Sequence, residues 1–269
     1  MESYRMIIHG GMPYMSLGAY GTLCTEVYDL TKPVGQSIGG DLEYYKERLR
    51  SCRGRILEAM CGSGRLLIPL AEAGLAVDGI DESPQMLASC QGRCEERGLT
   101  PRLFQGKLQE LSLSCLYEAI IVPAGSFLLI EDREESVDVL RRFHDHLMPG
   151  GRLILDLEMP DLQSLKTGST GMSTFPHPDG TVITMESRTV EADLYRQVVV
   201  THLRYEKWRQ GSLVASELQR LALRWFGIEE FRMLLENTGF SKVTVSADYE
   251  YGRAPSHHRQ IFTYEANRN

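Results

Sequence analysis

Hydrophobic and polar positions between residues 51 and 159 follow two periods in turn. Short apolar runs, typical of buried strands, are separated by longer stretches in which apolar side chains recur at helical spacing. The expected strands are 55–59, 76–80, 102–105, 119–122 and 152–157. The expected helices are 63–73, 83–97 and 134–147. This alternation predicts a parallel sheet covered by helices on both faces, with ligands bound beyond the carboxyl ends of its strands.

The pattern changes after Pro160. Residues 161–180 are rich in Gly, Ser, Thr and Pro, which predicts a long loop or a mobile lid. The next expected strands follow one another without helices, so they predict an antiparallel sheet inserted into the parallel fold. They span 182–190, 196–208 and 213–225. The chain then has an expected helix, 229–238, and two closing strands, 242–247 and 260–265.

The first fifty residues precede this alternation and form an extension. They contain two short helical patterns, 17–30 and 41–50, which are separated by Pro33 and several glycines. The chain is therefore expected to have three parts. They are a helical extension or lid at 1–50, a core at 51–159 and 226–269, and an inserted antiparallel β subdomain at 160–225.

Composition narrows the class of protein without naming a function. The net charge of -7 and the pI near 5.6 give no basic surface for nucleic acid. The six cysteines form no CxxC pair, and Cys90 and Cys94 would need further ligands to hold a metal, so we expect reduced cysteines and no metal. No apolar run reaches the roughly 18 residues of a membrane span. Because the first residues also lack a secretory layout, a soluble cytoplasmic protein is expected, without a membrane or nucleic-acid partner.

The segment from Ile56 to Arg65 predicts a buried strand that runs into a glycine turn and then into a helix. Asp81 follows Gly62 by nineteen residues, at the end of the next apolar run, where a carboxylate binds ribose hydroxyls. A dinucleotide fingerprint needs a third glycine where this chain has Leu67, and a P-loop needs a Gly-Lys-Ser/Thr ending that is absent. An acid-led turn with two glycines suits a nucleoside cofactor without phosphates, which is S-adenosylmethionine.

Four motifs in order resemble those of class I S-adenosylmethionine-dependent methyltransferases, nearest to bacterial small-molecule methyltransferases. Residues 58–65 are similar to the family's D/E-x-G/A-C-G-T-G, and residues 79–87 to its G-x-D-x-S-x-x-M-L. Residues 147–154 contain the L-x-P-G-G turn, and residues 235–240 match L-x-x-x-G-F. The resemblance implies a doubly wound, Rossmann-like sheet of seven strands, to which the chain adds its N-terminal helical extension and its inserted antiparallel sheet.

The resemblance also implies roles for side chains around the cofactor. Asp81 would bind the ribose, Glu58 would order the turn around the methionyl amine, and Met86 would pack on the adenine. Two alternatives stay open: Asp81 as an acid at a helix N-terminus, and Met86 as ordinary core. The remaining cofactor-binding candidates are Ala59, Met60, Cys61, Gly62, Gly64, Arg65, Glu82, Lys107, Leu108, Pro123 and Tyr28.

Two residues depart from the family's pattern. Met60 stands where the family usually has Gly or Ala, so the turn must bend around a larger side chain. Lys107 stands where an Asp often receives the adenine amino group, so backbone at Leu108 or Gln109 is the alternative recognition element.

No catalytic residue stands out, because positioning alone supplies much of a methyl transfer. Ser126 is a candidate to touch the cofactor or substrate, or else a helix cap. His257 and His258 are candidate general bases in a loop on the active-site side. Arg65 is expected either to bind the methionyl carboxylate or to lie on the solvated surface. Tyr44 and Tyr45 are expected to be either lid residues or core residues. His144 and His146 are expected on a solvated face.

The leading functional hypothesis is an enzyme that moves a methyl group from S-adenosylmethionine to N or O of a small-molecule acceptor. The insert after Pro160 is expected to lie on the substrate side and to choose the acceptor, with a loose similarity to sugar N-methyltransferases. The alternatives are a non-catalytic module that binds S-adenosylmethionine, a protein or RNA methyltransferase, and a dinucleotide-dependent oxidoreductase.

Overall fold

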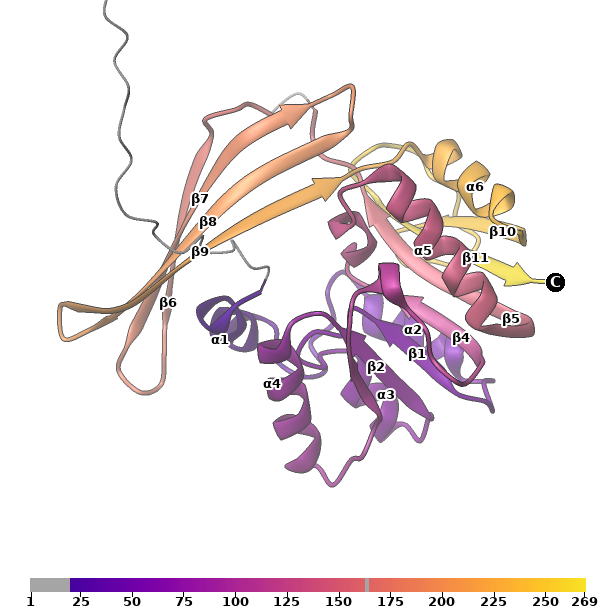
Figure 1. Cartoon of the computed structure of the whole chain (residues 1–269), viewed down its shortest axis with the longest axis horizontal. Coiled ribbons are helices and arrows are strands. Elements are labelled where there is room, and N and C mark those ends of the chain that lie inside the picture. The colour runs from indigo at the N-terminus through magenta and orange to yellow at the C-terminus, as the bar shows by residue number, and fades with distance from the viewer. Residues whose placement is uncertain (1–19, 163–164) are drawn as a thin grey trace, which may run out of the picture.

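The computed structural model describes residues 20–162 and 165–269, and Figure 1 shows how their helices and strands are arranged. The larger sheet contains β1 (Ile56–Ala59), β2 (Val77–Asp81), β3 (Leu103–Gln105), β4 (Tyr117–Val122), β5 (Leu147–Glu158), β10 (Phe240–Ala247) and β11 (Ile261–Arg268). The smaller sheet contains β6 (Thr170–Pro176), β7 (Val182–Asp193), β8 (Val198–Arg209) and β9 (Ser212–Arg224). The helices are α1 (Thr22–Thr31), α2 (Asp41–Leu49), α3 (Leu67–Glu72), α4 (Pro84–Glu95), α5 (Arg133–His146) and α6 (Ile228–Asn237), with 3₁₀ turns η1 (Leu108–Glu110) and η2 (Ser126–Leu129).

The larger sheet has seven strands in the order β10-β11-β5-β4-β1-β2-β3. All neighbours are parallel except β11, which runs antiparallel to both β10 and β5. The strand order reverses between β1 and β4, which is the point where open α/β sheets bind ligands. The predicted doubly wound fold with seven strands is confirmed.

Helices cover the sheet on both faces because its central strands are apolar on both sides. In β1, Leu57 belongs to a buried cluster with Phe143 of α5 and Phe231 of α6. Its neighbour Ile56 belongs to a second cluster, with Leu70 of α3. The side-chain alternation of a strand thus separates two cores.

The smaller sheet is antiparallel, in the order β6-β7-β8-β9, and projects from the larger one, with α1 against it (Figure 1). Its strands lie between β5 and α6 in the chain, so the expected inserted antiparallel sheet is present. β6 was expected to be loop. As an edge strand it pairs only with β7, and its side chains are largely exposed, so its sequence carries no apolar alternation.

Smaller differences concern element ends and packing. α3 is shorter than the helix expected at 63–73, and β5 begins at Leu147 instead of residue 152. Part of the helix expected at 17–30, residues 17–19, lies outside the described residues. Tyr44 and Tyr45 are buried, with hydroxyls that donate to Glu265 and Asp156, so both belong to the core.

The two histidines of α5 do not form the solvated face that was expected. His144 packs edge-on against Phe240, with ring centroids 5.3 Å apart. His146 Nε2 accepts a hydrogen bond from the Leu113 backbone N–H at 3.0 Å. Both side chains therefore join α5 to its neighbours.

All six cysteines are free thiols. No group of His, Cys, Asp and Glu within residues 20–162 and 165–269 has the arrangement of a metal site. None of the helices in these ranges is long and apolar enough to cross a membrane.

Asp78 ties three strands of the larger sheet together. Its buried carboxylate accepts hydrogen bonds from Arg55 before β1, from Arg102 before β3 and from the Tyr117 hydroxyl of β4. Burial alone raises the pKa of Asp78, but the hydrogen bonds from the two arginines outweigh it and hold the pKa below its ordinary value.

We expect Asp78→Asn to lower the free energy of unfolding by about 2–3 kcal/mol, because charge-assisted bonds to a buried carboxylate are lost. Urea denaturation at pH 7 measures this loss. The matched control is Asp138→Asn, which breaks an exposed pair with Arg141 and should change stability by less than about 0.5 kcal/mol. Equal losses in the two variants would contradict a structural role for Asp78.

Candidate functional site

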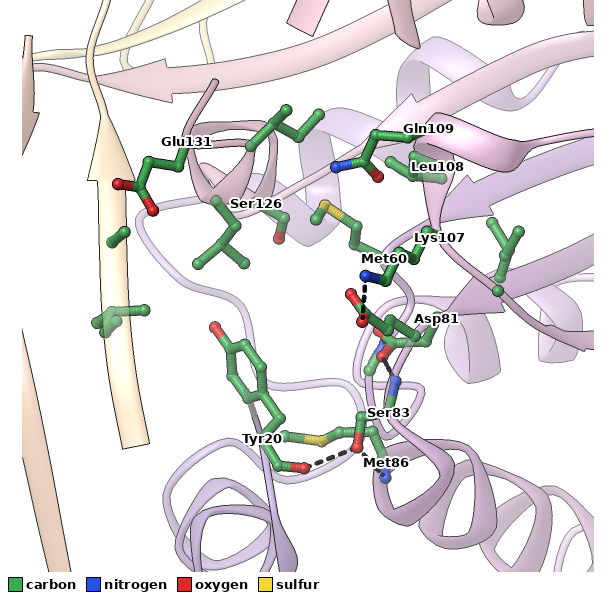
Figure 2. A pocket seen from close by; sticks show the side chains of 18 of the residues that line it. Tyr20, Met60, Asp81, Ser83, Met86, Lys107, Leu108, Gln109, Ser126 and Glu131 are labelled. Atoms are coloured by element: carbon green, nitrogen blue, oxygen red, sulfur yellow. Dashed lines mark hydrogen bonds and ion pairs between the residues drawn. The ribbon is translucent and has the colours of Figure 1, made fainter. Parts of the chain in front are cut away.

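A cavity of about 1050 Å³, including the space open to solvent, lies beyond the carboxyl ends of β1, β2 and β3. Its first wall is built by the turn after β1, the start of α4 and the segment from Gly106 to Gln109. Its second wall is built by η2 with the residues that follow it and by β9 of the smaller sheet. Tyr20 and Tyr28 of the N-terminal extension complete the lining (Figure 2).

Asp81 lies at the junction of the first wall. One carboxylate oxygen accepts from the Gly62 backbone N–H at 2.8 Å, and the other accepts from the Ser83 N–H at 2.9 Å. Burial raises the pKa of Asp81, and these hydrogen bonds partly oppose that rise. Because a carboxylate has about four lone-pair positions, Asp81 keeps acceptor capacity toward the cavity that it lines.

The two glycines of the turn have different surroundings. Gly62 lines the cavity, and a Cβ there would meet only Met86 Sδ, at 3.9 Å. A Cβ on Gly64 would lie 2.7 Å from Cys90 Sγ, so Gly64 allows α4 to approach the turn. Both have positive φ, +53° and +84°, which glycine adopts without strain. Gly62 therefore faces the cavity, and Gly64 serves packing.

Met60 lines the same turn with a φ of +58°, in the left-handed region that costs a side chain about 1–2 kcal/mol. Its side chain lines the cavity near Lys107 (Figure 2) and packs on the larger apolar cluster. This conformation explains why Met60 is the unusual residue of the motif: the backbone here favours glycine, and strained residues of this kind gather at functional sites.

Glu58 of β1 is a buried acid next to this turn, although it is not one of the cavity-lining residues. It is 2 % exposed, and its Oε2 has no hydrogen-bond partner within the described ranges. Burial, the largest cause, raises its pKa to about 8, with Arg65 opposing and the Asp41 and Asp81 carboxylates adding to the rise. The carboxyl is therefore mostly protonated at neutral pH and lacks a cationic or hydrogen-bonding partner.

The far side of the first wall carries the residues expected near an adenine. Lys107 and Glu82 form an exposed ion pair at 3.5 Å, and both line the cavity with Leu108 and Gln109. Met86 is 2 % exposed and also lines the cavity, so it is both a buried residue and part of the cavity wall.

The second wall contains one ion pair in an otherwise apolar surface. Glu131, just after η2, binds Arg220 of β9 through both of its carboxylate oxygens, at 2.5 and 2.9 Å. The hydrogen bonds from Arg220 lower the pKa of Glu131. Ser126 also lines this wall, but its hydroxyl donates to the Pro123 carbonyl at 2.7 Å.

Several residues expected at the site are placed elsewhere. Arg65 is buried and binds Asp41 and the Gln36 carbonyl, so the alternative of a solvated Arg65 is wrong. His257 and His258 are exposed on the loop between β10 and β11 and do not line the cavity. The remaining expected residues lie behind the lining: Ala59, Cys61 and Pro123.

Sequence reasoning missed several residues of the cavity, among them Glu131 and residues 220–222, and the most informative of those missed is Tyr20. It has a φ of +56°, and its ring reaches into the cavity toward η2 (Figure 2). Its position depends on the docking of α1 against the smaller sheet, more than 150 residues later in the chain, and no local pattern carries that information.

Comparisons with known proteins agree with this geometry. A methyltransferase domain model matches residues 56–151. The chain is 25 % identical to a cypemycin N-terminal methyltransferase of Streptomyces sp, over 86 % of this chain and 90 % of that protein. Its fold is similar to that of a methyltransferase from Clostridium acetobutylicum, with a TM-score of 0.74, 16 % identity and coverage of 91 % and 97 %. The sugar N-methyltransferase KedS8 from Streptoalloteichus sp gives a TM-score of 0.70, 23 % identity and coverage of 97 % and 100 %.

The fold, the glycine turn and these matches define an enzyme of the methyltransferase class. The chain is a class I S-adenosylmethionine-dependent methyltransferase, and S-adenosylmethionine is its cofactor. The structure fits this cofactor in two respects: Gly62 presents open backbone to the cavity, and Glu58 holds a buried carboxyl oxygen without a partner.

Glu58 should make the stability of the cofactor-free protein depend on pH. Its pKa of about 8 in the folded protein exceeds the ordinary value of 4.5, so its stabilising contribution is present at low pH and is lost as pH rises toward and through 8. Glu58→Gln should remove this loss. The variant should gain on the order of 4 kcal/mol relative to wild type between pH 4.5 and pH 8. Urea denaturation at several pH values measures the difference, and parallel pH profiles would contradict the assignment.

Proposed function

We propose that this enzyme transfers the methyl group of S-adenosylmethionine to an amine nitrogen of a small-molecule acceptor. The observation that carries the proposal is that, once Asp81 binds the ribose, no free general base is left among the described side chains that line the cavity. Glu131 is neutralised by Arg220, Lys107 is paired with Glu82, and the Ser126 hydroxyl is already a donor to backbone.

This absence favours nitrogen over oxygen. A neutral amine carries a nucleophilic lone pair and needs no base before the transfer, whereas a hydroxyl needs a base or a metal to become an alkoxide. Tyr20 and Tyr28 do not supply one, since burial raises the pKa of both phenols. An acceptor amine that binds in its neutral form can therefore be methylated without a base from the protein.

Three side chains are proposed to hold the cofactor. Asp81 binds the ribose hydroxyls with its remaining lone pairs, and Met86 packs on the adenine. Glu58 offers its unpartnered oxygen to the methionyl ammonium, which would draw the carboxyl into its ionised form. Support comes from the hydrogen bonds that orient Asp81 and from the burial of Glu58.

When bound, S-adenosylmethionine would supply a methyl group on a sulfonium: a nucleophile in line with the sulfur–carbon bond would attack the methyl carbon, and the neutral thioether, S-adenosylhomocysteine, would leave. The contribution of the chain is to exclude water and to fix the acceptor opposite the cofactor. Tyr20, Tyr28 and Met60 close the middle of the cavity, and η2 with β9 forms the wall where the acceptor would bind.

The relatives support an amine acceptor without naming it. One is a sugar N-methyltransferase and another is an N-terminal peptide methyltransferase. We infer a small acceptor of this kind, and the six free thiols favour a reducing cytoplasmic location. A peptide N-terminus is the second candidate, because one of the relatives is a cypemycin N-terminal methyltransferase.

The test of the proposed function is methyl transfer from labelled S-adenosylmethionine to matched pairs of acceptors. Each pair consists of an amino sugar, or a short peptide with a free N-terminus, and its hydroxyl counterpart. We expect product only from the amines, with a rate that rises with pH as the amine loses its proton. Transfer to the hydroxyl partners at a similar rate would contradict the nitrogen assignment.

Asp81→Ala should weaken binding of S-adenosylmethionine by roughly tenfold or more, the scale of one lost charge-assisted hydrogen bond. Isothermal titration calorimetry with the wild type and the variant measures the change. Glu95→Ala is the control: it removes an exposed carboxylate of α4 that accepts from Gln91 and does not line the cavity, and a change below about threefold is expected. Unchanged affinity in Asp81→Ala would contradict the ribose assignment.

A further inference from the structure

We propose that Glu217 of β9 is a positioning residue that holds α1, and with it Tyr20 and Tyr28, over the cofactor half of the cavity. The proposal deepens the proposed function and rests on its cofactor assignment. Glu217 touches neither wall of the cavity, and it would act through the helix that it caps.

The first observation is that α1 has no cap of its own. Its N-cap residue is Gly21, no side chain of its own segment accepts from its first amides, and its first turn contains no acid. Glu217 supplies the missing acceptor: its carboxylate accepts from the Leu23 N–H at 2.9 Å and from the Cys24 N–H at 3.3 Å. A negative charge at this end also complements the helix dipole.

Gly21 makes room for this contact. A Cβ at position 21 would lie 2.6 Å from Cδ of the Glu217 side chain, closer than any real Cβ contact. Any other residue would push the carboxylate away from the helix. The Glu217 carboxylate can therefore cap α1 only because residue 21 is a glycine, although the two residues are far apart in the sequence.

The second observation is that the apolar face of α1 packs on the smaller sheet. Leu23, Cys24 and Val27 form a buried cluster with Ile183 and Tyr205. An ion pair at 2.6 Å between Lys207 of β8 and Glu26 of α1 adds to this attachment.

The hydrogen bond and the ion pair between α1 and α4 both involve Asp29. The Ser89 hydroxyl donates to Asp29 at 2.6 Å, and Arg93 forms an ion pair with Asp29 at 3.0 Å. Polar contacts of this kind exchange with water at small net cost, whereas separating the apolar cluster would expose hydrocarbon. The sheet, through Glu217 and the cluster, is therefore the main anchor of α1.

The third observation is the connection from this anchor to the cofactor half. Tyr20 precedes α1, and its carbonyl accepts from the Ser83 hydroxyl at 2.7 Å. The Ser83 N–H donates to Asp81, whose other oxygen accepts from Gly62. Figure 2 shows the Tyr20–Ser83 contact beside Met86. Since Tyr20 and Tyr28 line the cavity, loosening the start of α1 opens a path for the cofactor.

The test measures the dissociation rate of S-adenosylhomocysteine from the full chain by surface plasmon resonance. Glu217→Ala should release it about tenfold faster than wild type. Glu217→Gln keeps one acceptor oxygen and should release it about threefold faster, which gives a measurable effect with little disturbance of the fold. The matched control is Glu186→Ala: Glu186 lies on β7 of the same sheet and pairs with Arg204 of β8 at 2.6 Å, and the rate should stay at the wild-type value.

Hydrogen exchange of the peptide that covers α1 supplies the second readout. It should become faster in Glu217→Ala, while the exchange of β1 and β4 stays unchanged. Faster exchange of α1 with an unchanged release rate would overturn the proposal, as would an unchanged release rate in both Glu217 variants with normal thermal unfolding. If the wild type itself binds no S-adenosylhomocysteine, the cofactor assignment fails instead, which separates the two conclusions.

Discussion

The hydrogen bonds of Asp81 are the interaction on which the cavity depends. The carboxylate joins the turn after β1, through Gly62, to the start of α4, through Ser83. Ser83 then caps α4 by accepting from the Met86 N–H and donates its hydroxyl to Tyr20. The side chains of Asp81 and Ser83 together thus connect three backbone segments that come from different parts of the chain. A group with this many local partners is held in one orientation, which is what recognition of a diol requires.

This arrangement has an electrostatic cost that the cofactor can offset. Glu58, Asp81 and Asp156 are acids whose pKa values are raised by burial, to about 8 for Glu58 and about 6 for Asp156. Asp156 has partners, since it accepts from Tyr45 and from the amides of the segment after β4. Glu58 keeps an oxygen without one. A cationic ligand restores the ionised form of such a group, so part of the binding free energy comes from relieving an unfavourable state of the free protein.

The parallel half of the molecule could be predicted from sequence because its information is local. The glycines after β1 and the acid at the end of β2 lie within thirty residues of one another, and the strand and helix periods predicted the parallel sheet. The resemblance to class I methyltransferases implied its seven strands, which the structure has. Features that depend on distant contacts could not be predicted. β6 carries no apolar alternation because it is an exposed edge, and Arg65 is buried only because Asp41 of α2 meets it. The domain boundaries and the roles of the site residues remain predictions.

The inserted sheet contributes both to the cover of the cofactor half of the cavity and to the wall where the acceptor would bind. Glu217 and Leu221 lie on the same strand, and because side chains alternate along a strand they point to the same face, about 13 Å apart. Glu217 caps α1 over the cofactor half, while Leu221 lines the wall where the acceptor would bind. Glu131 attaches this stretch of β9 to the larger domain through Arg220. A displacement of β9 therefore alters the acceptor wall and the cover of the cofactor together. On the proposed assignments, the insert would contribute to the closure of the cavity as well as to the choice of acceptor.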